Sequence, residues 1–166
     1  MILEIELTQS DKDYAEKIGR GRNERKRLAG RPDGLIKGNS LERDIQGAEG
    51  ELAVSKMLEI PYDGDPMPDK VWEKWRKTGT DVGGRFEVRC VNMDNGDLFL
   101  YDRDKDYAPY VLVTRNGRGK FRMVGWIYGR DGKQKKYWEI GKTRNLLRPC
   151  YCVPQSDLHD MESLPK

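Results

Sequence analysis

The amino-acid sequence predicts an α+β domain in which N-terminal helices precede a mixed, mostly antiparallel sheet. Two patterns support this class: helix-compatible segments dominate the first third of the chain, and apolar and polar residues alternate as in strands in much of the remainder. The chain has 166 residues, enough for one domain with a hydrophobic core. We therefore expect a single domain over residues 1–166, with a basic strand–helix extension at 1–40, a core at 41–153 and a tail at 154–166.

The first half of the chain is expected to be mainly helical. Residues 2–7 alternate as in a short strand with one wet face. A basic helix, or two short ones, should follow at 10–28, and a second helix should begin at residue 41 or 47 and end at Leu58. The two tryptophans at positions 72 and 75 are expected on a short strand or turn.

After residue 80 the pattern has the period of two that is typical of strands. The longest pair of expected strands should form a hairpin, with a loop of sequence RNGRG between them. The last strand contains Pro154, which cannot donate to a ladder, so we expect it at a sheet edge. A helical turn or tail should close the chain. The strands are expected at residues 85–91, 97–102, 110–114, 120–129 and 151–155.

The composition excludes several classes of protein. Charged residues make up 36% of the chain, against about 25% in an ordinary domain, and no apolar run approaches the roughly 18 residues of a spanning helix. The chain start has no signal-peptide pattern, so we expect a cytoplasmic protein that does not bind a membrane. Three cysteines argue against a disulfide framework, and the single histidine argues against histidine-dependent catalysis.

The charges are segregated along the chain. Residues 17–31 carry a net +6 and residues 115–148 a net +9, so the rest must carry −12 to give the total of +3. Two basic segments in an otherwise acidic chain are suited to binding a polyanion at one face of the protein. This pattern predicts contact with nucleic acid, and with DNA more than with RNA. The expected contacts are Arg20, Arg22, Arg25, Lys26 and Arg27 on the first helix and Arg118, Lys120 and Arg122 at the hairpin.

A second pattern, of two acidic residues and an arginine around a predicted turn, indicates a site for a metal ion and a phosphate group. Asp81 stands just before a Gly-Gly turn, and Glu87 and Arg89 share one face of the strand that follows. A tight hairpin would bring the two carboxylates together at one edge of the sheet. Paired carboxylates on rigid strands suit a hard divalent cation, and a nearby cation can bind a phosphate group.

These residues resemble the motif of the PD-(D/E)xK nuclease superfamily, which includes restriction enzymes and Holliday-junction resolvases. In that pattern a helix with an acidic residue precedes an Asp and then a strand with Glu-x-Lys. Here the helix would carry Glu51 within GAEGELAVSKML, the Asp would be Asp81, and Glu87-Val88-Arg89 would stand for Glu-x-Lys. The layout is also similar to small nuclease-like proteins of bacteriophages, so the location would then be the host cytoplasm.

The resemblance implies a restriction-endonuclease-like core and a divalent-metal-dependent nuclease that cleaves DNA, including branched or structured DNA. Asp81 and Glu87 would bind Mg²⁺ or Mn²⁺, Glu51 would complete the shell or hold a metal-bound water, and Arg89 would bind the scissile phosphate. Arginine replaces the usual lysine and cannot act as a general base. That departure supports an alternative, a catalytically inactive module of the same fold that binds nucleic acid or a host protein.

The sequence supports three further interpretations. The segment DRDKDY at residues 102–107 has the opening of a calcium loop but lacks its later positions, so it is interpreted as a solvated acidic loop. Structure-selective nucleases often act as two-fold dimers, and the outer strands offer an edge, so a homodimer is expected. A third hypothesis is an interaction protein whose acidic body binds a basic host partner.

Overall fold

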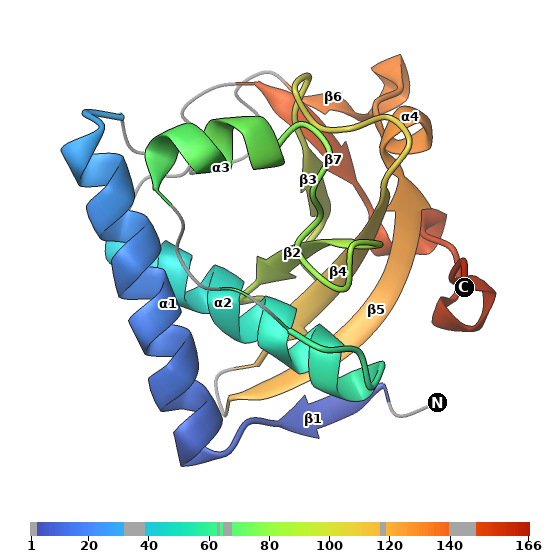
Figure 1. Cartoon of the computed structure of the whole chain (residues 1–166). Coiled ribbons are helices and arrows are strands. Elements are labelled where there is room, and N and C mark those ends of the chain that lie inside the picture. The colour runs from blue at the N-terminus through green and yellow to red at the C-terminus, as the bar shows by residue number, and fades with distance from the viewer. Residues whose placement is uncertain (1–2, 32–38, 63, 65–67, 117–118, 140–148) are drawn as a thin grey trace.

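The computed structural model describes residues 3–31, 39–62, 64, 68–116, 119–139 and 149–166. It confirms the α+β class: two long helices cover one face of a four-stranded mixed sheet, and a second, three-stranded sheet packs near one end of it (Figure 1). Within the described part of the chain, no helix is both long and apolar enough to cross a membrane.

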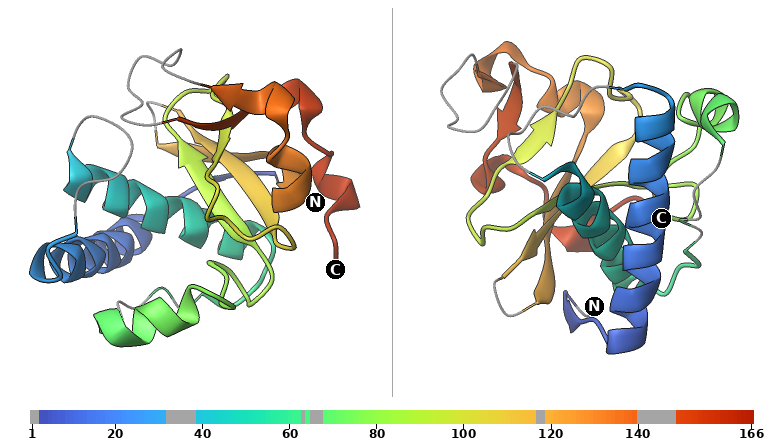
Figure 2. Two further views of the ribbon diagram at one scale, coloured as in Figure 1. Left: turned by 90° about the horizontal axis from the view of Figure 1, so that it is seen from above. Right: turned by 90° about the vertical axis from the view of Figure 1, so that its left-hand side faces the viewer.

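The helices form a layer on one side of the larger sheet. Helix α1 (Gln9–Leu28) begins at a capping box between Thr8 and Asp11, and α2 (Ser40–Met57) begins at the side chain of Asn39. Helix α2 packs on the sheet and α1 packs on α2, as the view from above shows (Figure 2). Their apolar side chains share one core with the sheet.

The larger sheet has the strand order β1-β5-β4-β2. Strands β4 and β5 form the predicted antiparallel hairpin, and β1 adds antiparallel to β5, whereas β2 pairs in parallel with β4. The parallel crossover, residues 92–108, contains β3 and a loop but no helix. The strands are β1 (Glu4–Glu6), β2 (Glu87–Val91), β3 (Leu98–Leu100), β4 (Pro109–Arg115) and β5 (Lys120–Tyr128).

The smaller sheet has the order β3-β7-β6 and its own apolar cluster against β4 and β5. Strand β6 covers Trp138–Glu139 and β7 covers Cys150–Val153. The expectation of an edge position for the last strand was wrong: β7 lies between β3 and β6, because it ends at Val153, just before the proline that cannot donate.

Four short helical segments differ from or refine the expectations. Helix α3 (Asp69–Trp75) contains the two tryptophans that we expected on a strand or turn. Helix α4 (Gly129–Gly132) follows β5 directly. The expected C-terminal helical turn is present as two 3-10 turns.

Both ends of the chain are integral to the fold. Strand β1 belongs to the main sheet, and α1 supplies Ala15 and Ile18 to its core. At the other end, His159 exchanges backbone hydrogen bonds with Trp126, and Met161 is buried in the same core. The segments expected as an N-terminal extension and a C-terminal tail therefore contribute directly to the packing.

Two glycines test the packing of α1 on α2. A Cβ atom on Gly19 would lie 2.5 Å from the Cα of Ile45, whereas a Cβ on Gly47 would meet nothing within 4 Å. We expect Gly19→Ala to lower the free energy of unfolding by about 1–3 kcal/mol through overpacking. Gly47→Ala should raise it by about 0.5–1 kcal/mol, because alanine loses less backbone freedom in a helix. Urea unfolding followed by circular dichroism measures both, and equal effects would contradict the close helix contact.

Candidate active site

The predicted turn brings Asp81 to the start of strand β2. Val82 and Phe86 exchange backbone hydrogen bonds across the turn, whose two glycines adopt positive φ values of 60° and 67°. The Oδ2 atom of Asp81 accepts a hydrogen bond of 2.8 Å from the backbone N–H of Val88. The turn and this bond fix the Asp81 carboxyl beside the strand that carries Glu87.

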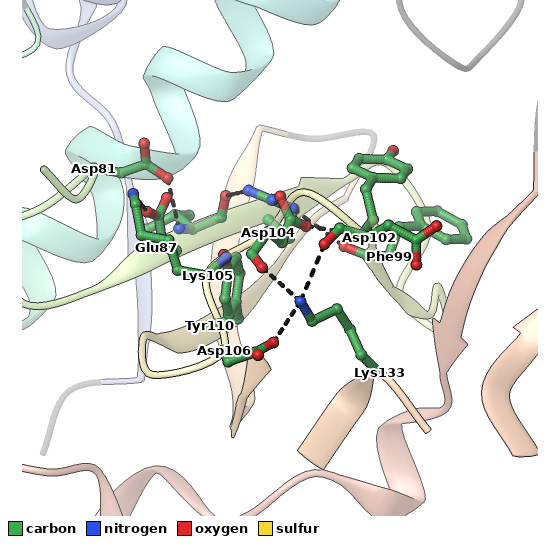
Figure 3. A network of polar contacts seen from close by, with 12 residues as sticks. Asp81, Glu87, Phe99, Asp102, Asp104, Lys105, Asp106, Tyr110 and Lys133 are labelled. Carbon is green, nitrogen blue, oxygen red and sulfur yellow. Dashed lines mark hydrogen bonds and ion pairs between the residues drawn. The ribbon is translucent and has the colours of Figure 1, made fainter. Parts of the chain in front are cut away.

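Glu87 lies beside Asp81 and forms an ion pair with Lys105, a residue that the sequence analysis did not assign to the site. The Nζ atom of Lys105 donates to the Glu87 carboxylate (Figure 3). It also donates to the carbonyl oxygen of Gly79. The side chains of Glu87 and Lys105 are only 9% and 12% exposed. An ammonium group and two carboxyl groups are thus held together where β2 begins.

Lys105 reaches this position because its loop, residues 101–108, is clamped to the sheets (Figure 3). The carboxylate of Asp104 accepts hydrogen bonds from the backbone N–H of Tyr101, at 2.9 Å, and from Arg89, at 2.8 Å. The Nζ of Lys133 donates to the carbonyl oxygen of Asp104 at 2.7 Å. The interpretation of this segment as a solvated acidic loop holds for its four exposed residues, Asp102, Arg103, Asp106 and Tyr107. It was wrong for Asp104 and Lys105, because these partners draw both side chains inward.

Arg89 lies on the predicted face of β2, but its guanidinium is occupied by the protein. Besides Asp104, it donates to the carbonyl oxygens of Phe99 and Val88, each at 3.2 Å, and it stacks on the ring of Tyr110 at 4.9 Å. These contacts tie β2 to β3 and to the loop that carries Lys105.

Glu51 is buried in α2 and forms a bidentate ion pair. Its two oxygens accept hydrogen bonds of 2.7 and 2.6 Å from Arg22 of α1, and the hydroxyl of Tyr62 donates to it at 2.7 Å. Its side chain is 7% exposed. The structure therefore places Glu51 within electrostatic range of Asp81, but with an arginine and a tyrosine as its contacting partners.

Electrostatics couple these groups. Burial and the adjacent Glu87 raise the pKa of Asp81 well above its ordinary value, against the opposing effects of Arg89 and the Val88 N–H. Burial also raises the pKa of Glu51, opposed by Arg22 and reinforced by the charge of Asp81. For Arg89, burial would lower the pKa, but Asp104 and Asp81 raise it above its ordinary value. The carboxyl groups are thus close enough to repel one another.

The predicted nucleic-acid contacts occupy different environments. Arg22 is partly buried on Glu51, while Arg20 and Arg27 pair with neighbouring glutamates of α1, each at 2.7 Å. Lys26 pairs with Asp44 of α2. Arg25 lies over the ring of Trp72. At the hairpin, Lys120 pairs with Glu4 at 3.6 Å, Arg122 donates to the carbonyl oxygen of Asp94, and Arg118 lies outside the described residues.

The donors available for a metal are oxygens of Asp81 and Glu87, the type that Mg²⁺ and Mn²⁺ prefer. Among the described residues, no group of three or more acidic, histidine or cysteine side chains is arranged to hold a metal ion. The pair of carboxyl groups that repel one another nevertheless fits a divalent cation, which would relieve that repulsion. Glu51 would have to leave Arg22 to join them.

Comparisons with protein-family models, with curated protein sequences and with solved structures found no match to this chain.

Proposed function

We propose that this protein is a divalent-metal-dependent nuclease with a restriction-endonuclease-like core, and that its site comprises Asp81, Glu87 and Lys105. The observation that carries the proposal is the ion pair of the Lys105 ammonium with Glu87, the carboxyl group that lies beside Asp81 at the start of β2. Arg89 stands where the motif has lysine, but Lys105 brings a primary amine to Glu87 from another part of the chain.

In this proposal each group has a separate task. Asp81 and Glu87 hold the cation, which when bound would lower the pKa of the attacking water and offset charge on the phosphate. The Lys105 ammonium donates a hydrogen bond to a phosphate oxygen and stabilises the negative charge that develops there. The ring centroid of Trp75 lies 5.9 Å from the Lys105 Nζ, so α3 contributes an aromatic side chain next to this ammonium.

Arg89 and Glu51 act as positioning residues in this proposal. Arg89 donates to Asp104 and to strand carbonyls, so it holds the Lys105 loop against β2. Glu51 fixes α1 to α2 behind Asp81 through Arg22. The substrate is a nucleic acid, with DNA and branched DNA as the first choices.

A catalytically inactive module of the same fold is the second candidate. The ion pairs themselves favour it, because Lys105 already neutralises Glu87 and Arg22 already neutralises Glu51 within the protein. A purely structural network would have this form. The two candidates differ in one respect: only a nuclease needs the carboxyl pair to bind a metal and cleave a phosphodiester bond.

Cleavage assays separate the two candidates. Labelled duplex, branched and single-stranded DNA and RNA are incubated with Mg²⁺, Mn²⁺ or EDTA. We expect metal-dependent cleavage of at least one substrate, and a loss of more than about 100-fold with Asp81→Asn or Glu87→Gln, because each removes a charged metal ligand.

The matched control is Glu162→Gln, the same chemical change at an exposed residue in a C-terminal 3-10 turn. It should leave cleavage unchanged. Calorimetric titration with Mn²⁺ should show binding to the wild type and to Glu162→Gln but not to Glu87→Gln. The inactive module would be favoured if the wild type cleaved none of the substrates and bound nucleic acid equally well with and without metal.

A further inference from the structure

The exposed face of α3 and the residues just after it carry several positive charges. Lys70, Lys74, Arg76 and Lys77 are all exposed, and none of them forms an ion pair with another described residue. Cations without such partners on one short segment raise the local positive potential and attract an anionic partner.

The basic helix α1 differs in this respect. Arg20, Arg22 and Arg27 each have a glutamate partner, and Lys26 has Asp44. These pairs lower the positive potential along α1, although its sequence is the more basic of the two. On α3 the acidic Glu73 is itself paired with Arg31, at 2.8 Å. The four exposed cations of residues 70–77 therefore stand without an ion-pair partner among the described residues, unlike the α1 cations named above.

Trp72 organises arginines from two parts of the fold around one ring. The guanidinium carbons of Arg25, Arg31 and Arg76 lie 4.4, 4.9 and 5.4 Å from its ring centroid. Stacking restricts a guanidinium to defined orientations while its N–H groups remain at the rim, where they can form bidentate contacts with an anion. Arg31 already uses these groups within the protein, because it donates to Glu73 of α3 at 2.8 Å. Arg76 has no side-chain hydrogen bond or ion pair with another described residue, so its donors are available to a ligand.

This segment adjoins the candidate site. Trp72 and Trp75 lie one turn apart on α3, about 5 Å along its axis, and Trp75 borders Lys105. The hydroxyl of Tyr107, in the Lys105 loop, donates to the carbonyl oxygen of Lys77 at 3.2 Å. Figure 1 shows α3 beside the C-terminal part of α1, where Arg25 stacks on Trp72.

We propose that α3 and the segment that follows it form the backbone-binding surface for the nucleic-acid substrate, with phosphates held by Arg76, Lys74 and Lys77. This inference rests on the proposed function for its choice of ligand. A phosphodiester chain fits better than an acidic protein, because planar guanidinium groups match phosphate oxygens and the surface leads directly to the carboxyl–ammonium site. The contacts are to phosphate, so binding does not depend on base sequence.

The test measures binding in EDTA, where metal-dependent cleavage cannot occur. Fluorescein-labelled 20-nucleotide single strands and 20-base-pair duplexes are titrated by anisotropy at several salt concentrations. The triple variant Lys74→Gln, Arg76→Gln, Lys77→Gln should bind at least about tenfold more weakly. The magnitude of its slope of log K against log salt should fall by about 0.7 to 0.9 for each phosphate that the variant no longer binds, the lower value being for single strands.

The control variant is Lys17→Gln, Arg20→Gln, Arg27→Gln, which removes the same charge from exposed positions of α1. It should change affinity less than threefold. Trp72→Leu, which keeps every charge but releases the stacked arginines, should weaken binding several-fold. The assignment would be overturned if the two triple variants lost affinity equally, or if the wild type did not bind nucleic acid. Displacement of bound DNA by polyglutamate at an equal concentration of charge would also overturn it.

The outcome is independent of catalysis. A protein that cleaves nothing but shows the expected difference between the triples would refute the nuclease proposal and keep the binding surface. If the wild type cleaves with metal but the two triple variants bind nucleic acid with equal affinity, the nuclease proposal stands and the substrate binds at another surface.

Discussion

Lys105→Met is expected to reduce cleavage by about 100-fold or more while leaving metal binding intact or tighter. The loss is the size seen when one preorganised donor is removed from an active site. Metal binding should survive because methionine removes a positive charge from the side of Glu87 without touching either carboxylate. Single-turnover cleavage and calorimetric titration with Mn²⁺ measure the two effects separately.

Lys133→Met is the matched control for this change. Lys133 holds the same loop through the carbonyl oxygens of Asp102 and Asp104 and through an ion pair of 2.5 Å with Asp106 (Figure 3). Its ammonium group is directed to these loop oxygens and not to the carboxyl pair, so its removal should reduce cleavage less than about tenfold. Equal losses from the two variants would show that Lys105 only anchors the loop.

Arg22→Met is expected to lower the free energy of unfolding by about 3–5 kcal/mol, because it leaves the buried Glu51 carboxylate without its charged partner. The double variant Arg22→Met, Glu51→Leu should recover most of that loss, since replacing both members of a buried pair by apolar groups is often neutral. Urea denaturation of the metal-free proteins measures the free energy of unfolding of the wild type and of both variants.

The pH dependence of the Arg22 variant gives a second check. Burial raises the pKa of Glu51, and losing Arg22 removes the main influence that opposes it. A carboxyl with a raised folded-state pKa contributes stability that is present below its unfolded pKa and lost as pH rises through the folded value. Arg22→Met should therefore be closer to wild-type stability at pH 5 than at pH 8, and the opposite trend would contradict the assignment of the pair.

The local parts of the site could be predicted from the sequence. The Gly-Gly turn and the alternation in β2 are short-range features, and they placed Asp81 near Glu87 on the predicted face. The α+β class followed from the change of period along the chain. These predictions succeeded because sequence neighbours determine the geometry.

The parts that depend on tertiary contacts could not be predicted. Lys105 reaches Glu87 from 18 residues away, through a crossover whose clamp involves Lys133 and Arg89. No short-range pattern distinguishes such a lysine from a solvated one. Helix α3 was missed, although the spacing of three between Trp72 and Trp75 places both rings on one side of a helix.

The hydrogen bond from Val88 to Asp81 also bears on aggregation. Strand β2 is an outer strand, and two of its outward backbone groups are met by side chains: Asp81 accepts from the Val88 N–H, and Gln46 donates to the carbonyl oxygen of Cys90 at 2.9 Å. A strand from another molecule cannot pair there without displacing them. The carboxyl that we assign to the metal thus also protects the folded chain against strand-to-strand association, and Asp81→Asn keeps an oxygen for this protection where Asp81→Ala would not.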